Sequence, residues 1–139
     1  VLIQGIGLVM SSDSSSLRVV RVERPEHFDG ALADAVKSGE TVWVLIEGAV
    51  TETGKSWCSD CEAARPVVNK ALEGKAGVIL ECPVERSEYR GNPEYPYRKH
   101  RQLKLTGVPT LYRWGRRGPV AKLVEEDLQD AAKVAELVE

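Results

Sequence analysis

The sequence predicts an α/β domain in which a central mixed β-sheet is flanked by helices on both faces. Apolar runs of strand length alternate with segments that carry apolar residues at helical spacing. The first half of the chain is predicted as β-α-β-α-β and the second half as β-β-α, an order that places parallel and antiparallel strands in one sheet. The 139 residues suffice for one core and show no internal repeat.

A valine-rich run predicts the first strand, and a proline and a glycine mark the start and the end of the first helix. Residues 17–22 are rich in valine and are expected to form a strand. Pro25 suits the first turn of a helix, where its missing N–H would have no partner, and Gly39 is expected to end that helix. Residues 41–46 are apolar and are predicted to form a buried strand.

A loop, a second helix and a third strand are expected next. Residues 47–56 contain two glycines and are predicted to form a loop. Residues 61–73 carry apolar side chains at helical spacing, and Pro66 is expected to kink this helix. Residues 77–82 form another short apolar run and are predicted to be a strand.

The second half begins with a polar segment and ends in a hairpin and a helix. Residues 83–102 are predicted to contain a helix around residues 95–101. Residues 110–114 and 120–124 flank a Gly-Arg-Arg-Gly sequence and are expected to pair as an antiparallel hairpin. Asp127 is expected to cap the final helix.

Composition excludes several function classes. The chain is 42% hydrophobic and 29% charged, as soluble globular domains are. Its formal net charge of -2 gives no bulk reason to bind nucleic acid or an anionic membrane. The apolar runs are far shorter than a bilayer span. Three unevenly placed cysteines favour a reducing compartment over a secreted disulfide scaffold, so a cytoplasmic location is expected.

Residues 1–16 differ from the rest of the chain. They begin with an apolar stretch without a basic region and continue into a serine-rich sequence. A remnant targeting segment is one interpretation. The preferred prediction is a tail that is disordered or not native to the protein, followed by a single domain over residues 17–139.

A Cys-x-x-Cys motif carries the chemistry. Cys58 and Cys61 are one helical turn apart and follow Trp57 directly, so their sulfurs can close a small disulfide. Cys58 is the expected nucleophile, because a helix N-terminus favours a thiolate through unpaired N–H groups and the helix dipole. Cys61 is predicted to be less exposed and to resolve the mixed disulfide.

Two charged residues in and beside the motif each have a functional and a structural interpretation. Asp60 is hypothesised to accept the proton of Cys61 as that thiol attacks, although its charge disfavours a nearby thiolate. The structural alternative is a carboxylate that stabilises the start of the helix. Lys55 can add positive field near the sulfur, and its structural alternative is an exposed loop residue.

The motif and its surroundings resemble the thioredoxin fold. Residues 54–61 look like the Clot family of thioredoxin-related proteins, which includes thioredoxin domain-containing protein 17 and carries Trp-Cys-Pro-Asp-Cys at this position. Further matches are the sequences at residues 66–68, 97–99 and 108–110, and the resemblance covers the chain from about residue 18 onward. Ser59 stands where the family has proline, so the redox potential and rigidity of the family site do not transfer directly.

The resemblance implies how substrate is held. The Val108-Pro109 bond would be cis and would face the dithiol, and the backbone of Val108 would pair with an extended substrate. A trans proline in an ordinary turn is the structural alternative. Trp57 is interpreted as the rim of the site rather than a core residue. Glu47 lies near the position where thioredoxins keep a buried acid, but it is predicted to face solvent.

The remaining cysteine and the two histidines invite a metal hypothesis. Zinc sites usually combine two ligand pairs, whereas this chain has one pair of cysteines, so a metal site is not expected. Cys82 is predicted to be a core residue.

The basic and aromatic sequence over residues 89–101 has two open interpretations: a substrate-selecting border of the redox site, or a solvated surface with inward tyrosines.

These observations predict a thiol-disulfide oxidoreductase that reduces disulfides with the Cys58–Cys61 dithiol. The resemblance implies recycling by a separate NADPH-dependent thioredoxin reductase, a flavoprotein, and substrates that are small or protein disulfides. The chain has no Gly-rich dinucleotide fingerprint in a strand-to-helix context, so no bound cofactor is expected. A monomer is expected. A redox-sensitive binding module and a dithiol oxidase or isomerase remain as alternatives.

Overall fold

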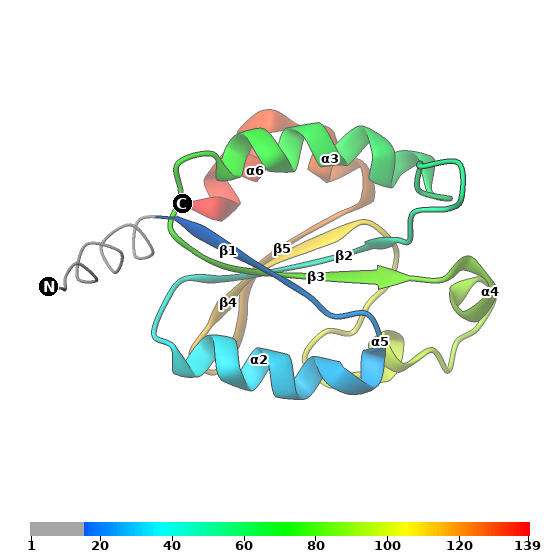
Figure 1. The fold of residues 1–139 in the computed structure, drawn as a ribbon, viewed down its shortest axis with the longest axis horizontal. Coiled ribbons are helices and arrows are strands. Elements are labelled where there is room, and N and C mark those ends of the chain that lie inside the picture. Colours follow the sequence, from blue (N-terminus) through cyan, green and yellow to red (C-terminus); the bar gives the residue numbers. More distant parts are fainter. Residues whose placement is uncertain (1–15) are drawn as a thin grey trace, which may run out of the picture.

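The structure, a computed structural model, describes residues 16–139 and confirms the predicted α/β class. A five-stranded mixed sheet lies between helices on both faces (Figure 1). In chain order the elements are β1 (Leu17–Arg21), the 3-10 helix η1 (Pro25–His27), α2 (Phe28–Lys37), β2 (Val42–Gly48), α3 (Ser59–Leu72), β3 (Gly77–Val84), α4 (Arg86–Tyr89), α5 (Pro96–Lys99), β4 (Thr110–Gly115), β5 (Gly118–Val124), the 3-10 helix η2 (Glu125–Gln129) and α6 (Ala131–Val138).

The strands lie in the order β1-β3-β2-β4-β5. β1 and β2 run parallel to β3, whereas β4 is antiparallel to β2 and β5 is antiparallel to β4. The central strand β2 is buried along its whole length. The cysteine motif follows β2, so it lies beyond the carboxyl end of the central strand, where α/β sheets commonly hold their ligands.

The two faces of the sheet carry separate apolar clusters. Alternate residues of β2 divide between them, because successive strand side chains point to opposite faces. Val42, Val44 and Ile46 join the cluster that contains the buried side of α2. Trp43 and Leu45 pack instead with the buried sides of α3 and α6. Figure 1 shows α3 and α6 together over one face and α2 over the other.

Several element boundaries differ from the sequence prediction. β2 and β3 each continue for two residues beyond their predicted ends, because residues 47 and 48 of β2 still pair with residues 83 and 84 of β3. Pro66 lies inside α3, which continues to Leu72. The predicted helix around residues 95–101 is shorter, and a second one-turn helix, α4, precedes it.

The cap of the last helix was predicted wrongly. The Asp130 side chain accepts hydrogen bonds from the backbone N–H groups of Ala132 and Lys133, so Asp130, not Asp127, caps α6. Asp127 lies inside η2, where its carboxylate pairs with the ammonium of Lys133 at 3.1 Å. Both aspartates fit the start of a helix. Because the chain forms the 3-10 helix η2 around Asp127, α6 begins three residues later than predicted, after Asp130.

The prediction for residues 1–16 lies outside the described residues, apart from Ser16. Among residues 16–139, every helix is too short or too polar to cross a lipid bilayer.

Candidate active site

The two cysteines of the motif lie at the start of α3. They form a disulfide, with their Cα atoms 5.2 Å apart. Cys58 is the N-cap residue of the helix, and its Sγ accepts a hydrogen bond from the backbone N–H of Cys61 at 3.2 Å. Cys58 is 8% exposed and Cys61 is 2% exposed, as the sequence predicted for an outer and an inner sulfur. Position and exposure therefore both favour Cys58 as the sulfur that meets substrate.

Backbone groups from β2 and its loop hold the sulfurs in place. The N–H of Gly48, the last residue of β2, donates to Cys61 Sγ at 3.3 Å. Ser56 Oγ donates to the Gly48 carbonyl at 2.8 Å and accepts from the Cys58 N–H at 3.1 Å. A Cβ on Gly48 would lie 2.8 Å from the Cβ of Cys58, so only glycine fits here. The sequence analysis missed Ser56, whose position two residues before the helix N-cap is the signal that could have found it.

The Val108-Pro109 turn forms the wall opposite Cys58. This peptide bond is cis, as the resemblance implied. The Val108 carbonyl oxygen lies 3.7 Å from Cys58 Sγ. Thr110 Oγ1 donates to the Gly107 carbonyl at 2.6 Å and so ties the turn together. The turn therefore places a backbone carbonyl directly beside the outer sulfur.

Trp57 lies at the rim of the site, half-buried. Its indole N–H donates to the Val84 carbonyl at 2.8 Å, which fixes the ring against the end of β3. The ring also contacts Tyr89 of α4, with centroids 6.0 Å apart. Trp57 thus links the cysteine motif to the segment that follows β3.

Glu47 is buried, which corrects the prediction that it faces solvent. It is the penultimate residue of β2 and pairs with Arg65 of α3, whose guanidinium also donates to Glu81 at 2.8 Å. Burial raises the pKa of the Glu47 carboxyl, and the nearby Arg65 opposes that rise. A buried carboxylate is tolerated here because the guanidinium of Arg65 contacts it. Arg65 is distant from Glu47 in the sequence, so local sequence spacing could not predict this pair.

Three other predicted site residues lie on the surface. Asp60 is exposed, and its carboxylate accepts a hydrogen bond from the amide of Gln129 at 3.4 Å. Ser59 and Lys55 are exposed as well. The roles of Asp60, Ser59 and Lys55 therefore stay predictions.

Cys82 is a core residue, as predicted. It is fully buried, and burial raises the pKa of its thiol to about 12. His100 is occupied elsewhere, because its Nε2 lies 2.8 Å from Asp29 and its Nδ1 faces two backbone N–H groups. Among residues 16–139, no three His, Cys, Asp or Glu side chains gather in a group suited to a metal ion.

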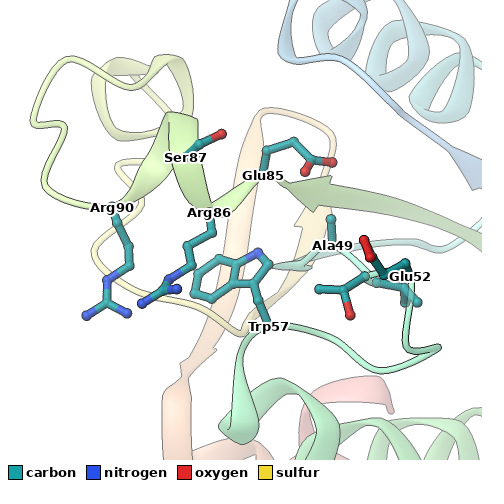
Figure 2. A pocket seen from close by; sticks show the side chains of 9 residues that line it. Ala49, Glu52, Trp57, Glu85, Arg86, Ser87 and Arg90 are labelled. Atoms are coloured by element: carbon teal, nitrogen blue, oxygen red, sulfur yellow. The ribbon is translucent and has the colours of Figure 1, made fainter.

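The segment over residues 89–101 combines the two predicted interpretations. Tyr89, Tyr95 and Tyr97 are buried and pack edge to face in succession, so the tyrosines do point inward. The start of the segment nevertheless borders the site. Figure 2 shows Trp57 beside Arg86 and Arg90 at one open pocket, whose volume is about 920 Å³.

Comparison with known proteins supports one family. A family model described as the thioredoxin domain of thioredoxin domain-containing protein 17-like proteins matches residues 21–139. Thioredoxin domain-containing protein 17 of Danio rerio is 37% identical over 115 residues, covering 81% of this chain and 88% of that protein. The Homo sapiens protein of the same name is 36% identical over 96 residues, covering 68% and 74%.

A second group of relatives is much longer. Acireductone dioxygenase of Leishmania braziliensis is 54% identical over 66 residues, covering 42% of this chain and 19% of that protein. The chain therefore spans about a fifth of the length of such relatives, and their name describes the longer proteins.

Solved structures confirm the thioredoxin fold. Thioredoxin O2 from Arabidopsis thaliana, in its oxidised state, superposes with a TM-score of 0.58 at 22% identity, covering 88% of this chain and 93% of that one. Thioredoxin f from spinach chloroplast gives a TM-score of 0.56 at 17% identity, covering 93% and 91%. At these identities the likeness establishes the fold.

Proposed function

Because this chain belongs to the thioredoxin domain-containing protein 17-like family and its close Cys58–Cys61 pair fits a thiol oxidoreductase, we propose that it reduces disulfides. The observation that carries the proposal is the position of Cys58. Its sulfur caps α3, accepts the Cys61 N–H and lies beside the Val108 carbonyl. This arrangement favours a thiolate at a place where an extended substrate can dock.

The first step is attack of the Cys58 thiolate on one sulfur of the substrate disulfide. A bond forms between Cys58 and that sulfur, the substrate S–S bond breaks, and the other half leaves as a thiolate. The N–H at the helix start and the helix dipole stabilise the Cys58 thiolate before attack. The backbone of Val108 holds the peptide flanking the attacked sulfur in an extended conformation.

The second step is resolution by Cys61. Its thiolate attacks Cys58 Sγ, the mixed disulfide breaks, and the second substrate thiolate leaves. The Gly48 N–H, 3.3 Å from Cys61 Sγ, stabilises negative charge on the inner sulfur. The protein ends as the Cys58–Cys61 disulfide, and two substrate thiols have gained the two electrons.

Reducing equivalents come from NADPH through a separate thioredoxin reductase-like flavoprotein, and the protein acts in the cytoplasm. The family membership supports the first statement, and the three unevenly placed cysteines support the second. A dithiol oxidase would instead need a more oxidising potential than that of a reductase, and Ser59 in the motif makes this the rival to exclude.

The test is NADPH consumption coupled to thioredoxin reductase, with cystine and a protein disulfide as substrates. We expect turnover that is abolished in Cys58→Ser. The matched control is Cys82→Ser, which removes the one cysteine outside the motif and should keep most of the activity. In Cys61→Ser, a mixed disulfide on Cys58 should accumulate and be visible by intact mass spectrometry.

Each contrary outcome identifies a different alternative. Equal turnover in Cys58→Ser and the unaltered chain would contradict the proposal. Formation of the Cys58–Cys61 disulfide without any turnover would point to an oxidase, and its equilibrium with glutathione would then reveal an oxidising potential. Retention of a protein partner by Cys58→Ser, with no turnover in the unaltered chain, would point to a binding module.

A further inference from the structure

An open pocket lined in part by the Trp57 indole adjoins the redox site, because Trp57 directly precedes Cys58 in the chain (Figure 2). Its lining combines that ring with charged side chains from two elements, namely Glu52 from the loop after β2, and Glu85, Arg86 and Arg90 from α4 and its ends. Trp57 is the residue directly before Cys58 in the chain, and its side chain lines the pocket. A group attached to a sulfur held at Cys58 can therefore extend across the indole into the pocket.

The two arginines are held beside the ring by the packing of α4. The Arg90 N–H donates to the Arg86 carbonyl at 2.9 Å, and this one-turn spacing places both side chains on the same face. Tyr89 lies against Trp57, and the guanidinium of Arg98 lies over the Tyr89 ring, 3.8 Å from its centroid. Arg98 also donates to the Tyr89 carbonyl at 2.6 Å. The backbone that carries the arginines is thus tied to the wall of the redox site.

Among the residues that the structure describes, neither of these arginines has a partner for its charge. Within residues 16–139, Arg86 and Arg90 take part in no ion pair, whereas Arg65 pairs with two glutamates and Arg98 donates hydrogen bonds to two backbone carbonyls. Figure 2 shows the two guanidinium groups on the same side of the indole, next to each other. Two like charges side by side repel each other, and an anion between them relieves that repulsion.

The carboxylates of the pocket lie apart from this pair. Figure 2 shows Glu52 across the indole from the arginines and Glu85 directed away from them. The positive and negative sides of the pocket are therefore separated by Trp57. A carboxylate on a substrate is attracted to the arginine side, and Glu52 weakens that attraction from the other side.

We infer that Arg86 and Arg90 form an anion subsite that selects disulfides bearing a carboxylate close to the reacting sulfur. The inference rests on the proposed reductase function, because the subsite acts on the group that remains attached to the sulfur bonded to Cys58. The reaction is unchanged: Cys58 and Cys61 give up two electrons as their disulfide forms, and the substrate S–S bond becomes two thiols. The subsite raises the rate of the first step for anionic substrates.

The test uses chemically reduced full chain and three small disulfides of similar size and different charge. Dithiodipropionate is anionic, hydroxyethyl disulfide is neutral and cystamine is cationic. The second-order rate of Cys58–Cys61 disulfide formation is followed by acid quenching, alkylation and mass spectrometry. Each rate is divided by the rate of dithiothreitol with the same disulfide, which removes differences in intrinsic reactivity. No reductase is needed.

We expect the anionic disulfide to react fastest after this normalisation. In Arg86→Gln/Arg90→Gln, its rate should fall about fivefold, as expected for the loss of two exposed ion pairs, while the neutral disulfide changes by less than about twofold. Salt at about 0.5 M should reduce the advantage of the anionic disulfide, because the subsite is open to solvent.

Three further variants serve as controls. Arg116→Gln removes one exposed cation near the Val42 end of β2, far from Cys58, and should leave the rates unchanged. Arg86→Lys/Arg90→Lys keeps both charges and should keep the preference. Glu52→Gln removes the opposing charge and should raise the rate with the anionic disulfide.

A rate that falls equally for all three disulfides, or does not fall at all, would overturn the anion subsite. The same holds if Glu52→Gln leaves the anionic rate unchanged. Because the chain is reduced chemically, a charge preference without NADPH turnover would overturn the proposed recycling and keep the subsite. If none of the disulfides oxidises the dithiol, the reductase proposal and the subsite are both contradicted.

Discussion

Removal of the Arg65 guanidinium is expected to destabilise the protein because it strips the cation from two nearly buried carboxylates. Arg65 lies on α3 and reaches Glu47 of β2 and Glu81 of β3. The side chains of Glu47 and Glu81 are 11% and 13% exposed, whereas that of Arg65 is 31% exposed. The variant Arg65→Met keeps the long side chain over the sheet and removes only the charge and its hydrogen bonds.

The expected loss of stability follows from these exposures. Breaking a fully buried ion pair by removing one partner costs about 3 to 5 kcal/mol. Water reaches the Arg65 end of this network, and Glu81 keeps a weaker contact with Arg21 at 3.5 Å, so the cost should be smaller. We expect about 2 kcal/mol, which lowers the melting temperature of a domain of this size by about 8 °C.

The loss should depend on pH in a defined direction. Burial already raises the pKa of Glu47, and removal of the nearby cation raises that pKa further. Between the ordinary glutamate pKa and the raised one, the folded protein holds one more proton than the unfolded chain, so stability falls as pH rises. The deficit of Arg65→Met should therefore be small at acidic pH and complete above the raised pKa of Glu47.

Urea denaturation of oxidised protein measures this effect at about pH 5 and about pH 7.5. The control is Glu47→Gln/Arg65→Met, which removes the buried charge together with its partner and should recover part of the lost stability at the higher pH. A deficit that is equal at both pH values, or no recovery in the double variant, would refute the view that an uncompensated Glu47 carboxylate causes the loss.

Three other predictions test the site and its frame. After reduction, iodoacetamide should modify Cys82 only when the protein is unfolded, because burial raises the pKa of that thiol to about 12; a third adduct on the folded protein, seen by mass spectrometry, would contradict this. Trp57→Phe loses the hydrogen bond to the Val84 carbonyl and should lower the free energy of unfolding by about 1 kcal/mol in urea denaturation, whereas an unchanged midpoint would count against that bond. Asp130→Ala should destabilise the protein by about 1 kcal/mol and Asp127→Ala by less, and the reverse order in thermal melts would restore Asp127 as the cap.

The fold was predictable because its local signals agree with one another. The apolar run that became β2 and the glycine-bounded hairpin of β4 and β5 were both anticipated from short stretches of sequence. The errors occurred where a partner distant in sequence decides the outcome. β2 continues through Glu47 because its backbone still pairs with β3, and Arg65 compensates the buried Glu47 carboxylate. Local hydropathy shows only a charged residue, at which a strand would be expected to end.

The site shows the same division. The spacing of Cys58 and Cys61 at a strand-to-helix junction predicted the disulfide and which of its two sulfurs is the more exposed, because both depend on one turn of helix. The place of Arg86 and Arg90 beside Trp57 could not be inferred, since it depends on how α4 packs on the indole.

The order of the strands and the cysteine pair could be predicted from the sequence, because periodicity, turn residues and a one-turn spacing act over a few neighbouring residues. The family was predicted from the resemblance of residues 54–61 and the other matching motifs, and the family model over residues 21–139 confirms it. Tertiary structure alone decided the burial of Glu47, the contact of the Val108 carbonyl with Cys58 and the pocket around Trp57. These features join segments that are far apart in the chain. The energies of these contacts depend on charge, burial and distance. All three are set only when the sheet and its helices pack together.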